Sequence, residues 1–62
     1  MESLKKYLTI KEVSELLSIP VGTLYNYVSS GKIPYFKIGG HVRFSIPMLE
    51  KWLQSKQHIP EI

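Results

Sequence analysis

Apolar residues near the start of the chain recur every three or four positions, the spacing at which they share one face of an α-helix. They are Ile10, Val13, Leu16 and Leu17, and the positions between them are polar or charged. Thr9 and Glu12 have the spacing of a capping box, in which each side chain bonds the main-chain amide of the other. Leu8 has the spacing to form a hydrophobic staple with Val13. The pattern therefore predicts a short amphipathic helix that begins after Thr9.

A second helix is predicted from a proline, an apolar face and a glycine. Proline disfavours the α conformation in the residue before it, so Pro20 ends the first helix and leaves Ser18–Pro20 as a tight turn. The apolar face that follows consists of Val21, Leu24 and Val28. Gly31 then stands where a helix end requires a positive φ. We expect a second helix of about three turns.

Beyond Pro34 the spacing changes from helical to alternating, which is typical of strands. The first strand has Phe36 and Ile38 on one face with Lys37 between them, and the second has Val42 and Phe44 with Arg43 between them. Gly39-Gly40 supplies the two positive φ values of a type I′ turn, so the strands form a hairpin. We expect Lys37 and Arg43 to project from the same region of it, which makes the hairpin a basic wing.

A last helix is predicted after the hairpin. Ser45 is suited to cap its N-terminus, and Pro47 falls in its first turn. Its apolar stripe consists of Ile46, Leu49, Trp52 and Leu53, with Trp52 in the core. The chain then divides into an N-terminal tail (1–6), one domain (7–55) and a C-terminal tail (56–62) without periodicity.

The order of these elements predicts the fold. A helix, a three-residue turn, a helix, a Gly-Gly hairpin and a helix make an α+β fold, mainly α, of the winged helix-turn-helix plan. In that plan the first helix braces the second from behind. The N-terminal half of the second helix is then free to enter a groove about 12 Å wide, the major groove of double-stranded DNA.

Composition narrows the classes of protein and of partner. The chain of 62 residues has no cysteine and a formal net charge of +3, and its two histidines lack the spacing of a zinc site. It lacks paired acid–base groups, so we expect no catalytic residues, no enzyme activity, no metal and no cofactor. No apolar stretch approaches the roughly 20 residues that cross a bilayer, and no secretory signal is present, so we expect a cytoplasmic protein without a membrane partner.

Positive charge is concentrated in the region of the predicted wing. No acidic residue occurs between Glu15 and Glu50, and the lysines, arginine and histidine of that interval are Lys32, Lys37, His41 and Arg43. This distribution suits an anionic partner. Plainer interpretations remain: lysine on a hairpin edge prevents strand pairing, and Lys32 is also explained as a solvated residue at a helix exit.

From Tyr7 to Leu53 the chain resembles the excisionase-type DNA-binding domain, a relative of MerR-type winged helix-turn-helix domains. No single matching element is specific, but their order is. The matching elements are Leu8-Thr9, Thr23-Leu24-Tyr25, Gly31-Lys32-Ile33-Pro34, Gly39 with Arg43-Phe44, and Leu49 with Trp52-Leu53.

The resemblance implies a protein of a prokaryote or phage whose second helix reads the major groove while the wing contacts phosphate or an adjacent minor groove. Asn26 is the best candidate for reading a base, because asparagine pairs bidentately with adenine. For Tyr25 and Tyr27 the alternative is packing with a solvated hydroxyl. The predicted DNA-binding residues are Val21, Gly22, Thr23, Tyr25, Asn26, Tyr27, Lys32, Lys37, His41 and Arg43.

Three departures from the resemblance indicate weak binding by a single molecule. Gly22 stands where related domains often have a larger polar or basic residue, Tyr25 where MerR-type relatives have arginine, and His41 where a second arginine is common. Fewer phosphates are then neutralised, so we expect a shallow dependence of affinity on salt. We expect a monomer in solution that associates cooperatively on DNA, and is nucleoid-associated when bound.

Three functions follow from the resemblance and the residues. The first is a recombination directionality factor, which binds and bends DNA near the ends of a mobile element and works with an integrase or other recombinase. The second is a small transcriptional regulator of the same fold. The third, from another class, is a protein-interaction module that has lost DNA binding.

Overall fold

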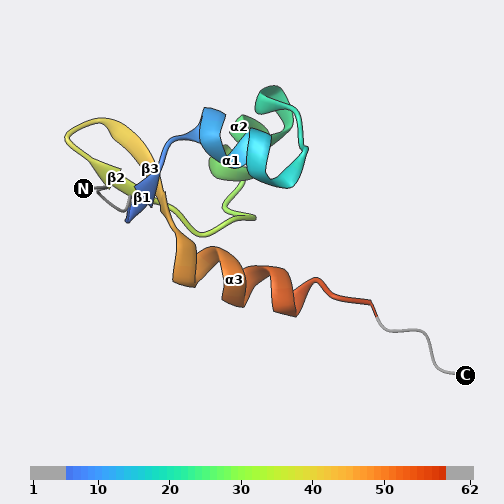
Figure 1. Ribbon diagram of the computed structural model, residues 1–62. Coiled ribbons are helices and arrows are strands. Elements are labelled where there is room, and N and C mark those ends of the chain that lie inside the picture. The colour runs from blue at the N-terminus through green and yellow to red at the C-terminus, as the bar shows by residue number, and fades with distance from the viewer. Residues whose placement is uncertain (1–5, 59–62) are drawn as a thin grey trace, which may run out of the picture.

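Three helices and three short strands make up residues 6–58, the part of the chain that the computed structural model describes (Figure 1). The elements are β1 (Tyr7–Leu8), α1 (Ile10–Leu17), α2 (Val21–Ser29), β2 (Phe36–Ile38), β3 (His41–Ser45) and α3 (Ile46–Ser55). This is the predicted winged helix-turn-helix fold. Most of each predicted tail, at residues 1–5 and 59–62, lies outside the described residues.

The capping box before α1 is confirmed. The Thr9 hydroxyl accepts a hydrogen bond from the Glu12 amide at 3.1 Å, and the Thr9 amide donates to Glu12 Oε1 at 2.9 Å. These two bonds satisfy main-chain amides that a helix N-terminus otherwise leaves without partners. They fix the point at which α1 begins and therefore the face that it turns to the core.

The turn between α1 and α2 is held by a side chain as well as by the main chain. The Ile19 amide donates to the Ser14 carbonyl at 3.2 Å, and the Ser14 hydroxyl donates to the Ile19 carbonyl at 2.6 Å. The predicted three-residue turn is confirmed, with Ser18 as the C-cap of α1 and Pro20 as the N-cap of α2. Ser18 adopts a left-handed φ of 57°, which the sequence pattern does not signal.

Replacing Ser18 by glycine is expected to stabilise the domain. The left-handed conformation costs a residue with a Cβ about 1–2 kcal/mol. The greater freedom of glycine in the unfolded chain offsets about 0.4–1 kcal/mol of that gain. Thermal unfolding followed by circular dichroism should show a higher Tm for Ser18→Gly, and Ser18→Ala, which keeps the Cβ, should show none. A lower Tm for Ser18→Gly would contradict the strain argument.

The end of α2 forms a Schellman motif around the predicted glycine. The Lys32 amide donates to the Tyr27 carbonyl at 2.8 Å, and the Gly31 amide donates to the Val28 carbonyl at 3.2 Å. Gly31 has a φ of 70°, as the motif requires. The chain therefore leaves α2 in a fixed direction, toward α3 and the hairpin.

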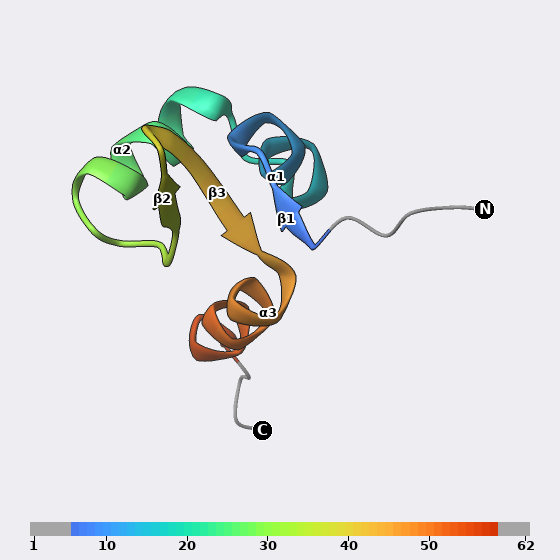
Figure 2. The same ribbon diagram turned by 90° about the vertical axis from the view of Figure 1, so that its left-hand side faces the viewer.

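The three strands form an antiparallel sheet in the order β1-β3-β2. The predicted Gly39-Gly40 turn joins β2 to β3, with φ values of 55° and 84°. Figure 2 shows α1 and α2 beside the sheet and α3 continuing from the end of β3. The strand β1 was not predicted, because two residues carry no periodicity.

The register of the hairpin corrects one prediction. The pairs are Phe36 with Arg43, Lys37 with Val42, and Ile38 with His41. Directly paired residues point to the same side of a sheet and successive residues to opposite sides. Lys37 and Arg43 therefore lie on opposite faces, so the prediction that they project from one region is wrong.

One face of the sheet is covered and the other is open. Val42, Phe44 and Leu8 share the inner face, toward the helices. The side chains of the opposite face, called the outer face below, are those of Tyr7, Phe36, Ile38, His41, Arg43 and Ser45. On it the Tyr7 and Phe36 rings meet edge to face with centroids 5.8 Å apart. The outer face thus combines exposed aromatic and aliphatic groups with Arg43.

The core takes one or more side chains from each helix and from β3. Its buried residues are Val13, Leu24, Ile33, Phe44 and Leu49. Of the predicted stripe on α3, only Leu49 is buried; Ile46 and Leu53 are exposed, and Trp52 is half-buried at the edge of the core. Leu16 of α1 is 62% exposed. The full predicted stripes are therefore wrong, because a core this small covers only the centre of each helix face.

Candidate nucleic-acid interface

The outward side of α2 carries a continuous stripe of exposed positions. Its members are Gly22, Tyr25, Asn26 and Ser29, which follow the i, i+3, i+4, i+7 spacing of one helix face. The opposite side holds Leu24 in the core, with Val28 packed against it. The α1–α2 turn and the Schellman motif fix both ends of α2. The stripe is therefore presented on a rigid, short helix.

Two side chains of the stripe are suited to contact with bases. Tyr25 is 54% exposed. Among the residues that the structure describes, the Asn26 side-chain amide makes no hydrogen bond, whereas its main-chain carbonyl accepts from the Ser30 hydroxyl at 2.8 Å and the Ser29 hydroxyl at 3.2 Å. An exposed amide with both donor and acceptor available matches the N6 and N7 atoms of adenine.

Gly22 leaves a gap in the stripe near the start of α2. A Cβ built at Gly22 would have no heavy atom within 4 Å outside its own helix backbone. The glycine is therefore not required for packing. Val21 and Thr23, the neighbours predicted to bind DNA, are half-buried at the two edges of the stripe.

Tyr27 lies on the other side of α2. Its ring meets that of Trp52 edge to face, with centroids 6.5 Å apart and an interplanar angle of 61°. Because residues turn by about 100° each around a helix, Tyr27 lies about 160° from Tyr25. The structure thus places Tyr27 outside the exposed stripe and gives it a packing contact with Trp52.

The wing divides its basic residues between two faces. Arg43 lies half-buried on the outer face, and its Nη1 donates to the Val42 carbonyl at 2.7 Å. His41 is exposed on the same face beside the glycine turn, and Lys37 is exposed on the inner-face side beyond the core. Lys32 is exposed after α2, outside the wing. A wing with cations on both faces has charge on whichever side meets a phosphate.

Sequence reasoning missed the fourth member of the stripe and the aromatic part of the outer face. Ser29 follows Gly22 by seven positions, so helical spacing alone could have included it. Phe36 pairs with Arg43 because a two-residue turn fixes the register, so the turn already implied that they share a face. Tyr7 had no such signal, since its place depends on the pairing of β1 with β3.

Other kinds of site receive no support from the described residues. Within 6–58, no three histidine, cysteine, aspartate or glutamate residues are grouped as a metal site requires. None of the helices in that range is long and apolar enough to cross a membrane.

Comparison with known proteins identifies the family. The model of a helix-turn-helix domain matches residues 7–57, which is most of the chain. No curated protein and no solved structure matches the chain. Helix-turn-helix domains of this kind bind double-stranded DNA and are generally not enzymes. The exposed stripe of α2, the hydrogen-bonded turn between α1 and α2, and the wing are the parts that such binding requires. The chain belongs to the helix-turn-helix domain family.

Proposed function

We propose that this chain is an excisionase-like recombination directionality factor, which binds and bends DNA near the ends of a mobile element. In this proposal the stripe of α2 enters the major groove while the wing contacts the adjacent backbone. The observation that carries the proposal is that α2 presents an exposed, uncharged stripe while the wing carries the nearby positive charge. The resemblance from Tyr7 to Leu53 supplies the recombination role.

The composition of this surface favours binding by several molecules on one DNA. The stripe has no charged side chain, so one molecule neutralises few phosphates and gains little affinity from counterion release. Bending DNA costs about 1–6 kcal/mol, which neighbouring subunits bound side by side can offset. Repeated sites beside a recombination end provide that arrangement, and an integrase or other recombinase is the expected partner there.

The test begins with selection of bound duplexes from random DNA. Tandem copies of a short site, cooperative mobility shifts and circular-permutation gels that reveal a bend are the expected results. Deletion of the protein should then reduce excision by the recombinase that acts at those sites. Isolated, unbent sites together with unchanged excision would exclude the recombination role.

The outcomes also separate the two other functions. Altered promoter activity with unchanged excision would identify a transcriptional regulator that uses the same stripe and wing. If no duplex gives a salt-sensitive shift, the fold serves as a protein-interaction module instead.

Gly22→Lys is expected to bind DNA more tightly than the wild type. Space is open at this position, and lysine also favours a helix over glycine by about 0.5–1 kcal/mol. One added phosphate contact should steepen the slope of log affinity against log salt by about 0.9. Filter binding at several salt concentrations measures both quantities. Weaker binding by a stable Gly22→Lys protein would instead mean that the backbone at Gly22 approaches the DNA directly.

A further inference from the structure

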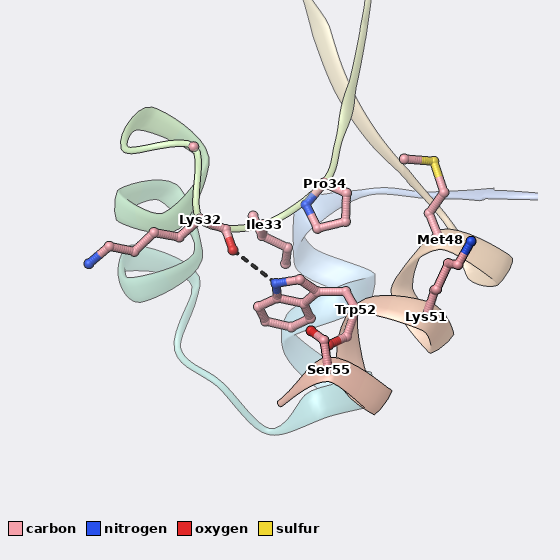
Figure 3. Close-up of a pocket in the computed structure, with 8 residues that line it drawn as sticks. Lys32, Ile33, Pro34, Met48, Lys51, Trp52 and Ser55 are labelled. Atoms are coloured by element: carbon pink, nitrogen blue, oxygen red, sulfur yellow. Dashed lines mark hydrogen bonds between the residues drawn. The ribbon is translucent and has the colours of Figure 1, made fainter. Parts of the chain in front are cut away.

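A groove lies beside Trp52, between α3 and the segment that leaves α2 (Figure 3). It is an open hollow of about 500 Å³, and the apolar residues of its floor are Ile33, Pro34, Met48 and Trp52. A second hollow of about 430 Å³ lies against Tyr27, Leu53 and Ile19 and shares Trp52 and Lys32 with the first. The two hollows make a surface, called the Trp52 groove below, that is largely apolar.

The indole of Trp52 is held in place within this groove. Its Nε1 donates to the Lys32 carbonyl at 2.9 Å, as the dashed line in Figure 3 marks. Its ring meets Tyr27 edge to face, and Lys56 Nζ lies 5.8 Å from the ring centroid. A fixed aromatic surface with one polar edge satisfied binds an apolar side chain with little loss of side-chain entropy.

The charges around the groove have one sign. Among residues 6–58, those that line the two hollows include Lys32, Lys51 and Lys56 and no acidic residue. All three lysines are exposed. Lys51 and Lys56 form the rim of the groove, whereas in Figure 3 the Lys32 side chain extends away from Trp52 and only the Lys32 carbonyl faces the indole. An occupant that complements this rim carries negative charge, and one that complements the floor carries apolar side chains.

The groove lies away from the stripe that faces DNA. Tyr27, which lines the second hollow, is on the far side of α2 from Tyr25. The sugar-phosphate backbone also has no apolar side chain for Pro34, Met48 and Trp52 to contact. A peptide with acidic and apolar residues satisfies both the floor and the rim.

We propose that the Trp52 groove binds an acidic segment of a partner protein through one or two apolar anchor residues, while α2 is bound to DNA. Lys51 and Lys56 attract the acidic residues, and Trp52 packs against the anchor. This role does not depend on whether the DNA is a recombination site or a promoter. It makes the domain an adaptor between DNA and a second protein.

Trp52 is the one tryptophan in the chain, so its fluorescence reports directly on the groove. The probe is a synthetic peptide of alternating glutamate and leucine, and the comparison peptide replaces leucine by serine. We expect the glutamate–leucine peptide to shift the emission and to bind the DNA complex without releasing the duplex. No shift, equal binding of both peptides, or displacement of the peptide by duplex DNA would overturn the proposal.

Substitutions at the rim and floor test where the peptide binds. Lys51→Glu and Lys56→Glu are each expected to weaken peptide binding by about fivefold, since each replaces an attraction by a repulsion. Met48→Gln should weaken it by removing apolar surface from the floor. The matched control is Lys11→Glu, an equal change of charge at an exposed position of α1, which should alter binding less than about twofold. Equal effects of Lys11→Glu and Lys51→Glu, in proteins shown to be folded by circular dichroism, would refute a groove-specific site.

Discussion

Phe44→Ala is expected to unfold the domain at physiological temperature, whereas Phe36→Ala is expected to leave it folded. The chain has two phenylalanines, on neighbouring strands of one hairpin, so the substitutions are chemically identical. They differ in position. Phe44 is 0% exposed on the inner face of the sheet, and Phe36 is 37% exposed on the outer face.

The size of the effect follows from burial. Truncating a fully buried phenylalanine costs about 3–5 kcal/mol, because the contacts are lost and the cavity does not fully collapse. Whole domains are stable by about 5–15 kcal/mol, and a chain of 62 residues buries too little surface to lie near the upper end. Replacing Phe44 by alanine therefore removes most of the free energy of unfolding of the domain. Phe36→Ala removes only the edge contact with Tyr7 and a partly buried surface, so we expect it to lower the free energy of unfolding by about 1 kcal/mol.

Urea unfolding followed by circular dichroism measures both variants. At physiological temperature we expect Phe44→Ala to be largely unfolded before urea is added, and Phe36→Ala to unfold at a modestly lowered urea midpoint. A Phe44→Ala protein that unfolds at nearly the wild-type midpoint would show that Phe44 is not central to the core. If Phe36→Ala were equally damaging, the outer face would have to be covered in solution.

Local chemistry made much of the fold predictable. The capping box before α1, the turn at Pro20 and the glycine after α2 each depend on residues within a few positions of one another. Their conformational preferences operate before any tertiary contact forms, so the sequence alone was sufficient. The positions of the helix ends then followed.

The features that the sequence did not predict depend on contacts between residues far apart in the chain. Alternation along a strand shows which residues share a face but not which face meets the core. The burial of Phe44 and the exposure of Phe36 settle that question. The pairing of Phe36 with Arg43 and of Tyr7 with Ser45 then assigns these residues to the outer face. Likewise, Trp52 has the spacing of a core residue, but its contact with the Lys32 carbonyl, 20 positions earlier, holds it at the edge.

The candidate site was predictable to the same extent as its elements. Helical spacing alone places Tyr25 and Asn26 on one face, and both are exposed there. It also places Tyr27 on another face, but only the contact with Trp52 shows that this face is packed. Whether each predicted residue touches DNA stays a prediction that binding measurements must test.

Asn26→Ala is expected to remove sequence preference while leaving the attraction to DNA in general. A bidentate contact from Asn26 to adenine is worth about 1–3 kcal/mol, so affinity for the selected site should fall by about five- to 150-fold. Affinity for unrelated duplexes should stay the same. Alanine favours a helix over asparagine, so α2 should not be weakened. Gln54→Ala, which removes an exposed amide from α3, is the matched control and should change neither affinity.

Arg43→Ala should give the opposite pattern, and the contrast between the two variants assigns the roles of α2 and the wing. A phosphate contact contributes equally on every sequence, so losing Arg43 should weaken all duplexes alike and reduce the salt slope by about 1. Arg43→Lys should keep the slope, because the charge is retained. If Arg43→Ala instead altered which sequences are selected, the outer face of the wing would be reading bases. If Asn26→Ala weakened all duplexes equally, α2 would be serving only to position the protein, and sequence preference would have to come from the shape and deformability of the DNA.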